Sequence, residues 1–262
     1  MTRKAVALFC VSVTLLAAYP SRAQTATTQS SRTARILFIG NSYTFYNGGL
    51  WTLVQAMAQS RGHDVQCVPS VSVGKTLEWH WNHGEARDAI AQGPWDVVIL
   101  QEFSMRPIDE PAKMFDYARR FDAAIRAAGA RTVFFMTWAR QHQPDKQRIL
   151  TEAYQRIASE LGAEVAPVGD AWQRALKKRP KLKLYQKDRS HPNQAGSYLS
   201  ACVIYATLFD DTPIGLPPVI RNDRRNAIIH LPPAEASFLQ RIAAETVGVA
   251  TQDVPTRPAA AD

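Results

Sequence analysis

Short apolar runs alternate with amphipathic segments along most of this chain. The run at residues 36–39 is followed by residues 48–62, in which Leu50, Leu53 and Met57 recur at helical spacing. The same pattern predicts strands at residues 36–39, 65–71, 95–100, 133–138 and 164–168, and helices at 48–62, 111–128, 145–161, 193–209 and 234–246.

The order of these elements predicts the fold class. Residues 95–100 (WDVVIL) are almost continuously apolar, as expected of a parallel strand buried on both faces. Strands that alternate with helices through short connections form a parallel sheet with helices on both sides. Reactive groups in such α/β proteins gather beyond the carboxyl ends of the strands.

The first residues have the features of an export signal. Arg3 and Lys4 precede an apolar stretch, 5–19, that is short for a membrane span, and small residues before Gln24 suit signal peptidase. An uncleaved N-terminal anchor is the alternative. The chain thus divides into a signal peptide (1–23), a flexible leader (24–33), a single domain (34–250) and a disordered tail (251–262). A periplasmic or secreted protein with no membrane span after cleavage is expected.

Composition is that of an ordinary globular protein, with 46% hydrophobic residues and a formal net charge of +8. Loss of the signal peptide removes three basic residues, which lowers the net charge to +5. Much of the excess of basic over acidic residues lies at residues 174–189. This basic stretch is either a solvated helix end or a surface that attracts an acidic polysaccharide. No nucleic-acid-binding motif accompanies it. Cys67 and Cys202, the cysteines outside the signal peptide, are either a disulfide or buried thiols.

Two segments carry the chemistry of a serine nucleophile. Ser42 follows the first predicted strand, and Asp188 and His191 lie in one short segment far along the chain. A serine hydroxyl is a weak nucleophile that needs an adjacent base and a third group to orient that base. The alternatives are a helix-cap role for Ser42 and a capping or surface role for His191.

These motifs carry a family resemblance. Gly40-Asn41-Ser42 after the first strand, Gly74 after the second, and Asp-x-x-His-Pro-Asn-x-x-Gly at 188–196 resemble the SGNH (GDSL-type) hydrolases over about residues 34–210. The resemblance implies an α/β fold, a flavodoxin-like three-layer α/β/α sandwich with a five-stranded parallel sheet. It also implies esterase chemistry.

The resemblance also implies roles for individual residues. Ser42 would be the nucleophile, His191 the general base, and Asp188 the group that orients the imidazole. The backbone amides of Ser42 and Gly74 would bind the oxyanion. The usual Gly-x-Asn-Asp of the third block is replaced by Leu-Gln-Glu-Phe-Ser at 100–104, so the side-chain amide of Gln101 is the candidate third donor.

Several other residues have two interpretations. Asn41, where many members have Asp, either contacts substrate or holds the nucleophile loop. Tyr43, Trp79 and Trp138 either stack against substrate or anchor the core. The role of Glu102 is open.

Two further residue pairs are candidate ligand-binding groups. His80 and His83 lack the further Cys or carboxylate ligands that a zinc site would need. Arg106 and Arg140 either bind an acidic substrate or face solvent.

The resulting expectation is an exported, metal-independent serine esterase that needs no cofactor and acts on a small-molecule or glycan ester. Its alcohol portion is predicted to be a carbohydrate carrying O-acetyl groups. The alternatives are a lipase or thioesterase for longer acyl chains, and a non-catalytic carbohydrate-binding protein with a degenerate site. Oligomeric state is not indicated by the sequence.

Overall fold

A computed structural model describes residues 33–222, 224 and 226–251 of the chain. Five parallel strands form its central sheet in the order β2-β1-β3-β4-β5. They are β1 (Ala34–Gly40), β2 (Val65–Val71), β3 (Val97–Leu100), β4 (Arg131–Phe135) and β5 (Glu164–Ala166). The predicted signal peptide, nearly all of the predicted leader and nearly all of the predicted tail lie outside the described residues.

The central strands are buried on both faces, which explains their continuous apolar character. Ile36 and Phe38 of β1 pack into one hydrophobic cluster, whereas Leu37 and Ile39 pack into a second cluster on the opposite face. Side chains of β3 alternate between the same two clusters. Successive side chains of a strand point to opposite faces, so an entirely apolar strand supplies both layers of the core.

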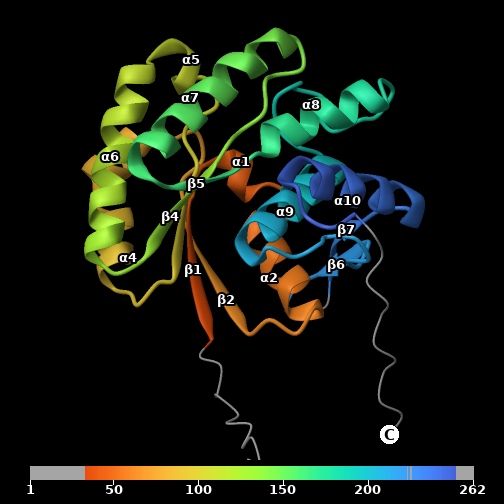
Figure 1. Cartoon of the computed structure of the whole chain (residues 1–262), viewed down its shortest axis with the longest axis horizontal. Helices are drawn as coiled ribbons and strands as arrows, with labels where there is room; N and C mark the ends of the chain where they lie inside the picture. Colours follow the sequence, from red (N-terminus) through yellow and green to blue (C-terminus); the bar gives the residue numbers. More distant parts are fainter. Residues whose placement is uncertain (1–32, 223, 225, 252–262) are drawn as a thin grey trace, which may run out of the picture. The chain divides into compact units, whose positions relative to one another are not determined.

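Helices cover the two faces of the sheet (Figure 1). One face is covered by α3 (Leu77–His83), α4 (Glu85–Ala91), α6 (Pro111–Ala127) and α7 (Gln147–Leu161). The other is covered by α2 (Leu50–Ser60), α8 (Val168–Lys178), α9 (Gln194–Phe209) and α10 (Pro233–Val247). Short elements α1 (Ser42–Phe45), α5 (Arg106–Asp109) and the 3-10 turn η1 (Pro144–Lys146) lie in loops. The predicted three-layer fold with five parallel strands is confirmed.

The structure also contains elements that the periodicity did not predict. Helices α3, α4 and α8 lie in segments for which no helix was predicted, and β6 (Val219–Arg221) pairs antiparallel with β7 (Ala227–His230). The fourth strand spans 131–135 rather than 133–138, because residues 131–134 pair with β3. The fifth ends at Ala166 because Val168 begins α8.

Both cysteines in the described part of the chain are free and buried, Cys67 on β2 and Cys202 on α9. Burial raises the pKa of the Cys67 thiol to about 12 and also raises that of Cys202. Both therefore behave as small apolar core residues rather than as reactive thiolates. Within the same residues, no helix is long and apolar enough to cross a bilayer.

Candidate active site

The nucleophile turn connects β1 to α1. Ser42 is the first residue of α1, and the preceding Asn41 caps the helix by accepting a hydrogen bond from Tyr43 N on its Oδ1 at 3.2 Å. A Cβ on Gly40 would lie 2.5 Å from Thr44 Oγ1 and 2.7 Å from Gln101 Oε1. Glycine is therefore required where the strand turns, because any side chain would collide with the groups that hold the turn.

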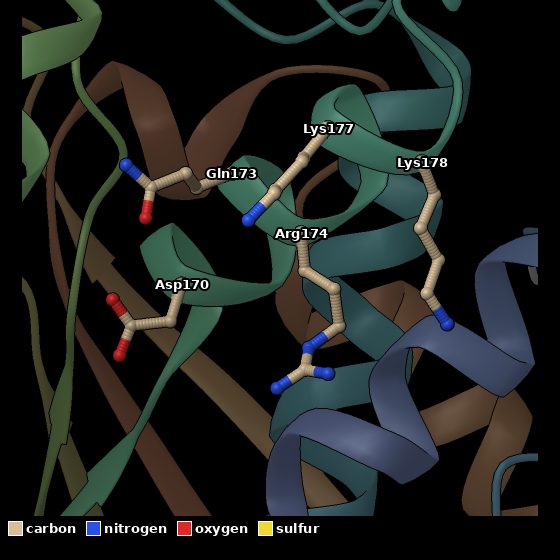
Figure 2. Close-up of a pocket in the computed structure, with 5 residues that line it drawn as sticks. All are labelled: Asp170, Gln173, Arg174, Lys177 and Lys178. Carbon is tan, nitrogen blue, oxygen red and sulfur yellow. The ribbon is translucent and has the colours of Figure 1, made fainter.

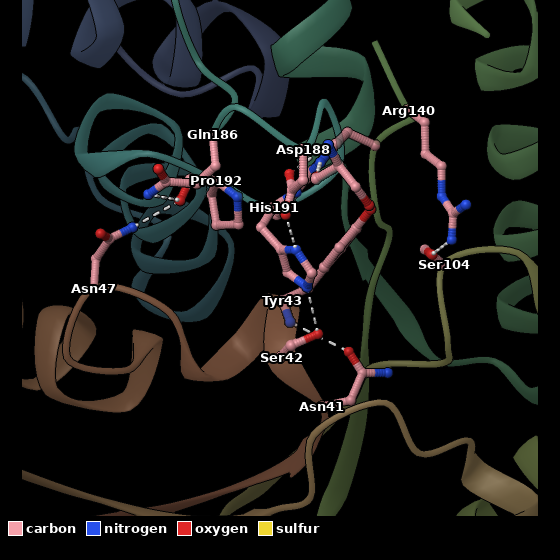
Figure 3. A network of polar contacts seen from close by, with 12 residues as sticks. Asn41, Ser42, Tyr43, Asn47, Ser104, Arg140, Gln186, Asp188, His191 and Pro192 are labelled. Atoms are coloured by element: carbon pink, nitrogen blue, oxygen red, sulfur yellow. Dashed lines mark hydrogen bonds and ion pairs between the residues drawn. The ribbon is translucent and has the colours of Figure 1, made fainter. Parts of the chain in front are cut away.

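Ser42, His191 and Asp188 form one hydrogen-bonded chain although 149 residues separate the serine from the histidine (Figure 3). Ser42 Oγ lies 2.9 Å from His191 Nε2, and His191 Nδ1 lies 2.6 Å from Asp188 Oδ2. These distances fit a hydroxyl whose proton can pass to the imidazole while the carboxylate fixes the other ring nitrogen.

Asp188 also organises its own loop. Its Oδ1 accepts hydrogen bonds from the backbone amides of Ser190 and His191 at 2.9 and 3.0 Å. Its slight burial favours the neutral acid, but the hydrogen bonds from His191 and from these two amides outweigh that effect and lower the pKa of Asp188. The carboxylate is thus ionised at neutral pH and can stabilise an imidazolium.

The loop that carries His191 is clamped to the rest of the site by aromatic side chains. Tyr43 OH lies 2.7 Å from Ser190 Oγ, and Trp138 Nε1 donates to Ser190 O at 3.0 Å. The Tyr43 and Trp138 rings stack at 4.4 Å, and Trp138 stacks in turn on Trp172 of α8 at 4.0 Å. These three rings thus form a continuous stack from the nucleophile turn to the helix layer.

Burial settles the two interpretations of Tyr43 and Trp138. Tyr43 is 3% exposed and Trp138 is 1% exposed, so neither ring can stack against a substrate. Their proposed contact with substrate is corrected: both are core anchors that position the triad loop. Trp79 is partly exposed on α3, where it stacks on His83 at 4.4 Å and lies under the Lys75 ammonium.

The side-chain amide of Gln101 contacts the nucleophile turn. Its Oε1 accepts hydrogen bonds from Asn41 N at 2.8 Å and Thr44 Oγ1 at 3.0 Å, and its Nε2 donates to Glu102 O. The amide oxygen and one of the two amide N–H groups are thus engaged within the protein, and the residue is 1% exposed. Gln101 therefore holds the nucleophile turn against β3, and its role as a third oxyanion donor stays a prediction.

Gly74 lies in a tight turn beside the nucleophile. Lys75 N donates to Ser72 O, and Gly74 has a φ of 73°, which glycine adopts without strain. Asn41 Nδ2 donates to Lys75 O at 2.8 Å, which ties this turn to Ser42. Asn41 therefore holds the loops together, the second of its two predicted roles. The oxyanion role of the Ser42 and Gly74 amides stays a prediction.

Two residues at the site were not assigned a catalytic-site role from sequence. His80 is buried, and its Nε2 donates to Gly40 O at 2.8 Å, while burial lowers its pKa and keeps it neutral. It thus fixes the end of β1. Tyr46 stacks on the His191 ring at 4.4 Å. Among the described residues, no group of three or more His, Cys, Asp or Glu is arranged to hold a metal.

Glu102 is buried beneath the turns of the site. Its Oε1 accepts from Leu77 N at 3.1 Å and Phe103 N at 2.6 Å. Burial outweighs these hydrogen bonds and raises the pKa of Glu102 from 4.5 to about 7. The carboxyl group is therefore a structural acid that binds its proton more tightly in the folded protein than in the unfolded chain.

This shift predicts a pH-dependent stability that Glu102→Gln should abolish. Between pH 4.5 and about 7 only the folded state keeps the proton, so wild-type stability falls as pH rises, by about 3 kcal/mol in total. The glutamine variant should lack this decrease. Urea unfolding of both proteins at pH 5 and pH 8 measures it, and parallel pH profiles would contradict the assignment.

The basic stretch at 174–189 begins on α8, where Arg174, Lys177 and Lys178 lie beside a surface pocket (Figure 2). Arg174 and Lys178 approach Glu245 of α10 at 3.7 and 2.6 Å. One carboxylate thus partly neutralises two of these cations, and the two ion pairs link the end of α8 to α10.

Three solved structures resemble this chain. A protein of Slackia heliotrinireducens, provisionally assigned as an SGNH hydrolase, is 27% identical with a TM-score of 0.57, and the match covers 68% of this chain and all of that one. A DUF4886 family protein of Bacteroides uniformis is 18% identical with a TM-score of 0.60 and coverages of 86% and 98%. An acetyl xylan esterase is 16% identical with a TM-score of 0.58 and coverages of 67% and 100%.

At 18% and 16% identity, the second and third likenesses concern the fold alone. No protein-family profile and no curated protein sequence matches the chain. The strand order, the motifs around Ser42 and His191, and the similarity to the Slackia protein nevertheless agree with one another. This chain has the fold of the SGNH hydrolases and resembles that family in the motifs around Ser42 and His191.

Proposed function

We propose that this protein is a serine esterase that hydrolyses carboxylic esters through Ser42. The observation that carries the proposal is the hydrogen-bonded chain from Ser42 Oγ through His191 to Asp188. Two segments far apart in the sequence supply these three residues. A cap or surface role for Ser42 and His191 would not require the two segments to meet. The solved structures of similar fold include esterases, which agrees with this chemistry.

The proposed reaction has two stages. His191 Nε2 takes the hydroxyl proton as Ser42 Oγ attacks the ester carbonyl, and the proton then passes to the departing alcohol. Water next attacks the acyl-enzyme, with His191 again acting as base. The amides of Ser42 and Gly74 are the proposed oxyanion donors, because Ser42 N opens helix α1 and the turn of Gly74 is tied to it through Asn41.

A carbohydrate O-acetyl ester is the first proposed substrate class, and the protein is proposed to act outside the cytoplasm. The signal-like residues 1–23 support export. The fold similarity to an acetyl xylan esterase and an acetyl-xylooligosaccharide esterase is the reason to test acetylated sugars first.

One observation favours esters of longer acyl chains instead. The large apolar side chains that are well exposed in the described residues are Phe45, at 53%, and Val73, at 63%. Phe45 is three residues from Ser42, and Val73 is adjacent to Gly74. Apolar groups beside a nucleophile suit contact with an acyl chain.

A fluorophosphonate probe and two ester substrates test these proposals. We expect the probe to modify the peptide that contains Ser42, detected by mass spectrometry, and the protein to hydrolyse p-nitrophenyl acetate. Modification elsewhere would mean that another residue is the nucleophile, and no turnover of any ester would exclude the esterase and favour the non-catalytic carbohydrate-binding alternative. A higher kcat/KM for p-nitrophenyl octanoate than for acetate would favour the longer-chain class.

A further inference from the structure

Arg140 lies beside the catalytic loop, in the segment that follows β4 (Figure 3). Three hydrogen bonds join this segment to the loop. Two run from the segment to the loop, from Trp138 Nε1 to Ser190 O and from Gln141 N to Arg189 O. The third runs the other way, from Tyr185 OH to Ala139 O. Arg140 is thus carried by backbone that is fixed to the same loop as Asp188 and His191.

No acidic partner neutralises the Arg140 guanidinium within the part of the chain that the structure describes. Its Nη2 donates to Ser104 Oγ at 3.5 Å, and its Nε is buried without a hydrogen-bond partner among these residues. Arg106 differs, because it meets Glu78 at 2.9 Å and Glu110 at 3.0 Å. Of these two arginines, Arg140 alone keeps its charge available for a ligand.

The Arg140 charge acts close to the nucleophile. Burial raises the pKa of Tyr43, while hydrogen bonds from Ser190 and Ser104 and the charge of Arg140 lower it. Tyr43 is the neighbour of Ser42, and its hydroxyl contacts Ser190 in the triad loop. A partly buried cation without a counter-ion is costly to the fold, and an anionic ligand would offset that cost.

We propose that Arg140 is a specificity-determining residue that binds a carboxylate on the ester substrate, so that the enzyme acts preferentially on acidic esters. The inference rests on the proposed esterase function. A guanidinium fork matches a carboxylate in two parallel hydrogen bonds, and Ser104, 5% exposed, adds a hydroxyl beside it. The carboxylate belongs either to the acyl part or to the alcohol part of the ester.

Two substrate pairs that differ by a carboxylate distinguish these sources. Phenyl acetate and 3-acetoxybenzoate place the charge on the alcohol part, and phenyl butyrate and phenyl hydrogen succinate place it on the acyl part. For one pair, we expect wild type to prefer the acidic ester. Arg140→Gln should lower kcat/KM for that ester about 10- to 100-fold, the range for loss of a charge-assisted contact, and change the neutral ester less than about 3-fold.

The control is Arg120→Gln, which removes the same charge from an exposed arginine of α6 paired with Asp116. It should leave both substrate ratios unchanged, and Arg140→Lys should restore part of the preference because it keeps the charge without the fork. Equal losses for both members of a pair in Arg140→Gln, or no acidic preference in wild type, would overturn the inference while leaving the esterase proposal intact.

A binding measurement decides the inference independently of turnover. Benzoate is titrated into each protein and its Kd is measured by NMR. The Kd for wild type should be at least about 10-fold lower than the Kd for Arg140→Gln, and the Kd for Arg120→Gln should equal that for wild type. If no ester is hydrolysed but this difference is found, the esterase proposal fails and the carboxylate site stands. Equal binding to wild type and Arg140→Gln would exclude the site.

Discussion

Replacing Ser42 or His191 with alanine is expected to lower kcat for ester hydrolysis about 10⁴- to 10⁶-fold, because either change removes the group that attacks or the base that activates it. The two side chains are 2.9 Å apart and act as one unit. The double variant should therefore be no slower than the slower single variant, within error. Steady-state rates with p-nitrophenyl acetate, corrected for spontaneous hydrolysis, measure all three.

His230→Ala is the matched control, because His230 is an exposed histidine on β7. It should keep wild-type kcat, and the melting temperatures of all variants should show that the fold is intact. Residual activity of Ser42→Ala above about one tenth of wild type would mean that another residue is the nucleophile.

Asp188→Asn is expected to lower kcat about 10⁴-fold while the protein stays folded. The asparagine amide can turn its NH₂ toward His191 Nδ1, which stabilises the tautomer that carries its proton on Nε2. That tautomer cannot accept the proton of Ser42. The backbone amides of Ser190 and His191, which the aspartate now holds, would still find an oxygen acceptor in asparagine.

The control for this variant is Asp116→Asn, an exposed aspartate of α6 that pairs with Arg120. It removes one carboxylate without touching the site, and its kcat should equal that of wild type. If Asp188→Asn retained more than about one tenth of wild-type kcat, Asp188 would not be the group that orients His191.

The central sheet could be predicted because the physics of its strands is local. Residues 36–39 and 97–100 are buried on both faces, so their apolar character is continuous and visible in the sequence. The hairpin of β6 and β7 could not be predicted in this way, because each strand has only three or four residues and few of them are buried. Such short strands leave no period to recognise.

The site shows a similar division. The spacing of Asp188 and His191 is local, and a single loop places both, so sequence could propose them together. The position of Gln101 depends on Gly40, whose missing side chain lets the amide reach the backbone of the neighbouring strand. Sequence supplied the amide group but not its direction.

Trp138 could be assigned only from tertiary structure. A tryptophan after a strand suits either a ligand or the core, and the decision depends on Trp172, which stacks on it from α8. That helix was not predicted, so the sequence offered no partner for the ring.

The ring stack makes an internal helix a remote determinant of catalytic geometry. Trp172 is 1% exposed and its indole N–H donates to Ser200 rather than to the catalytic residues, yet its ring is connected to the triad loop through the stack with Trp138 and Tyr43. Substitutions at Trp172 in α8 are therefore expected to lower the rate of turnover as well as the stability of the fold. Mutant libraries that aim at new substrates should keep Trp172 unchanged and vary exposed residues near the nucleophile instead.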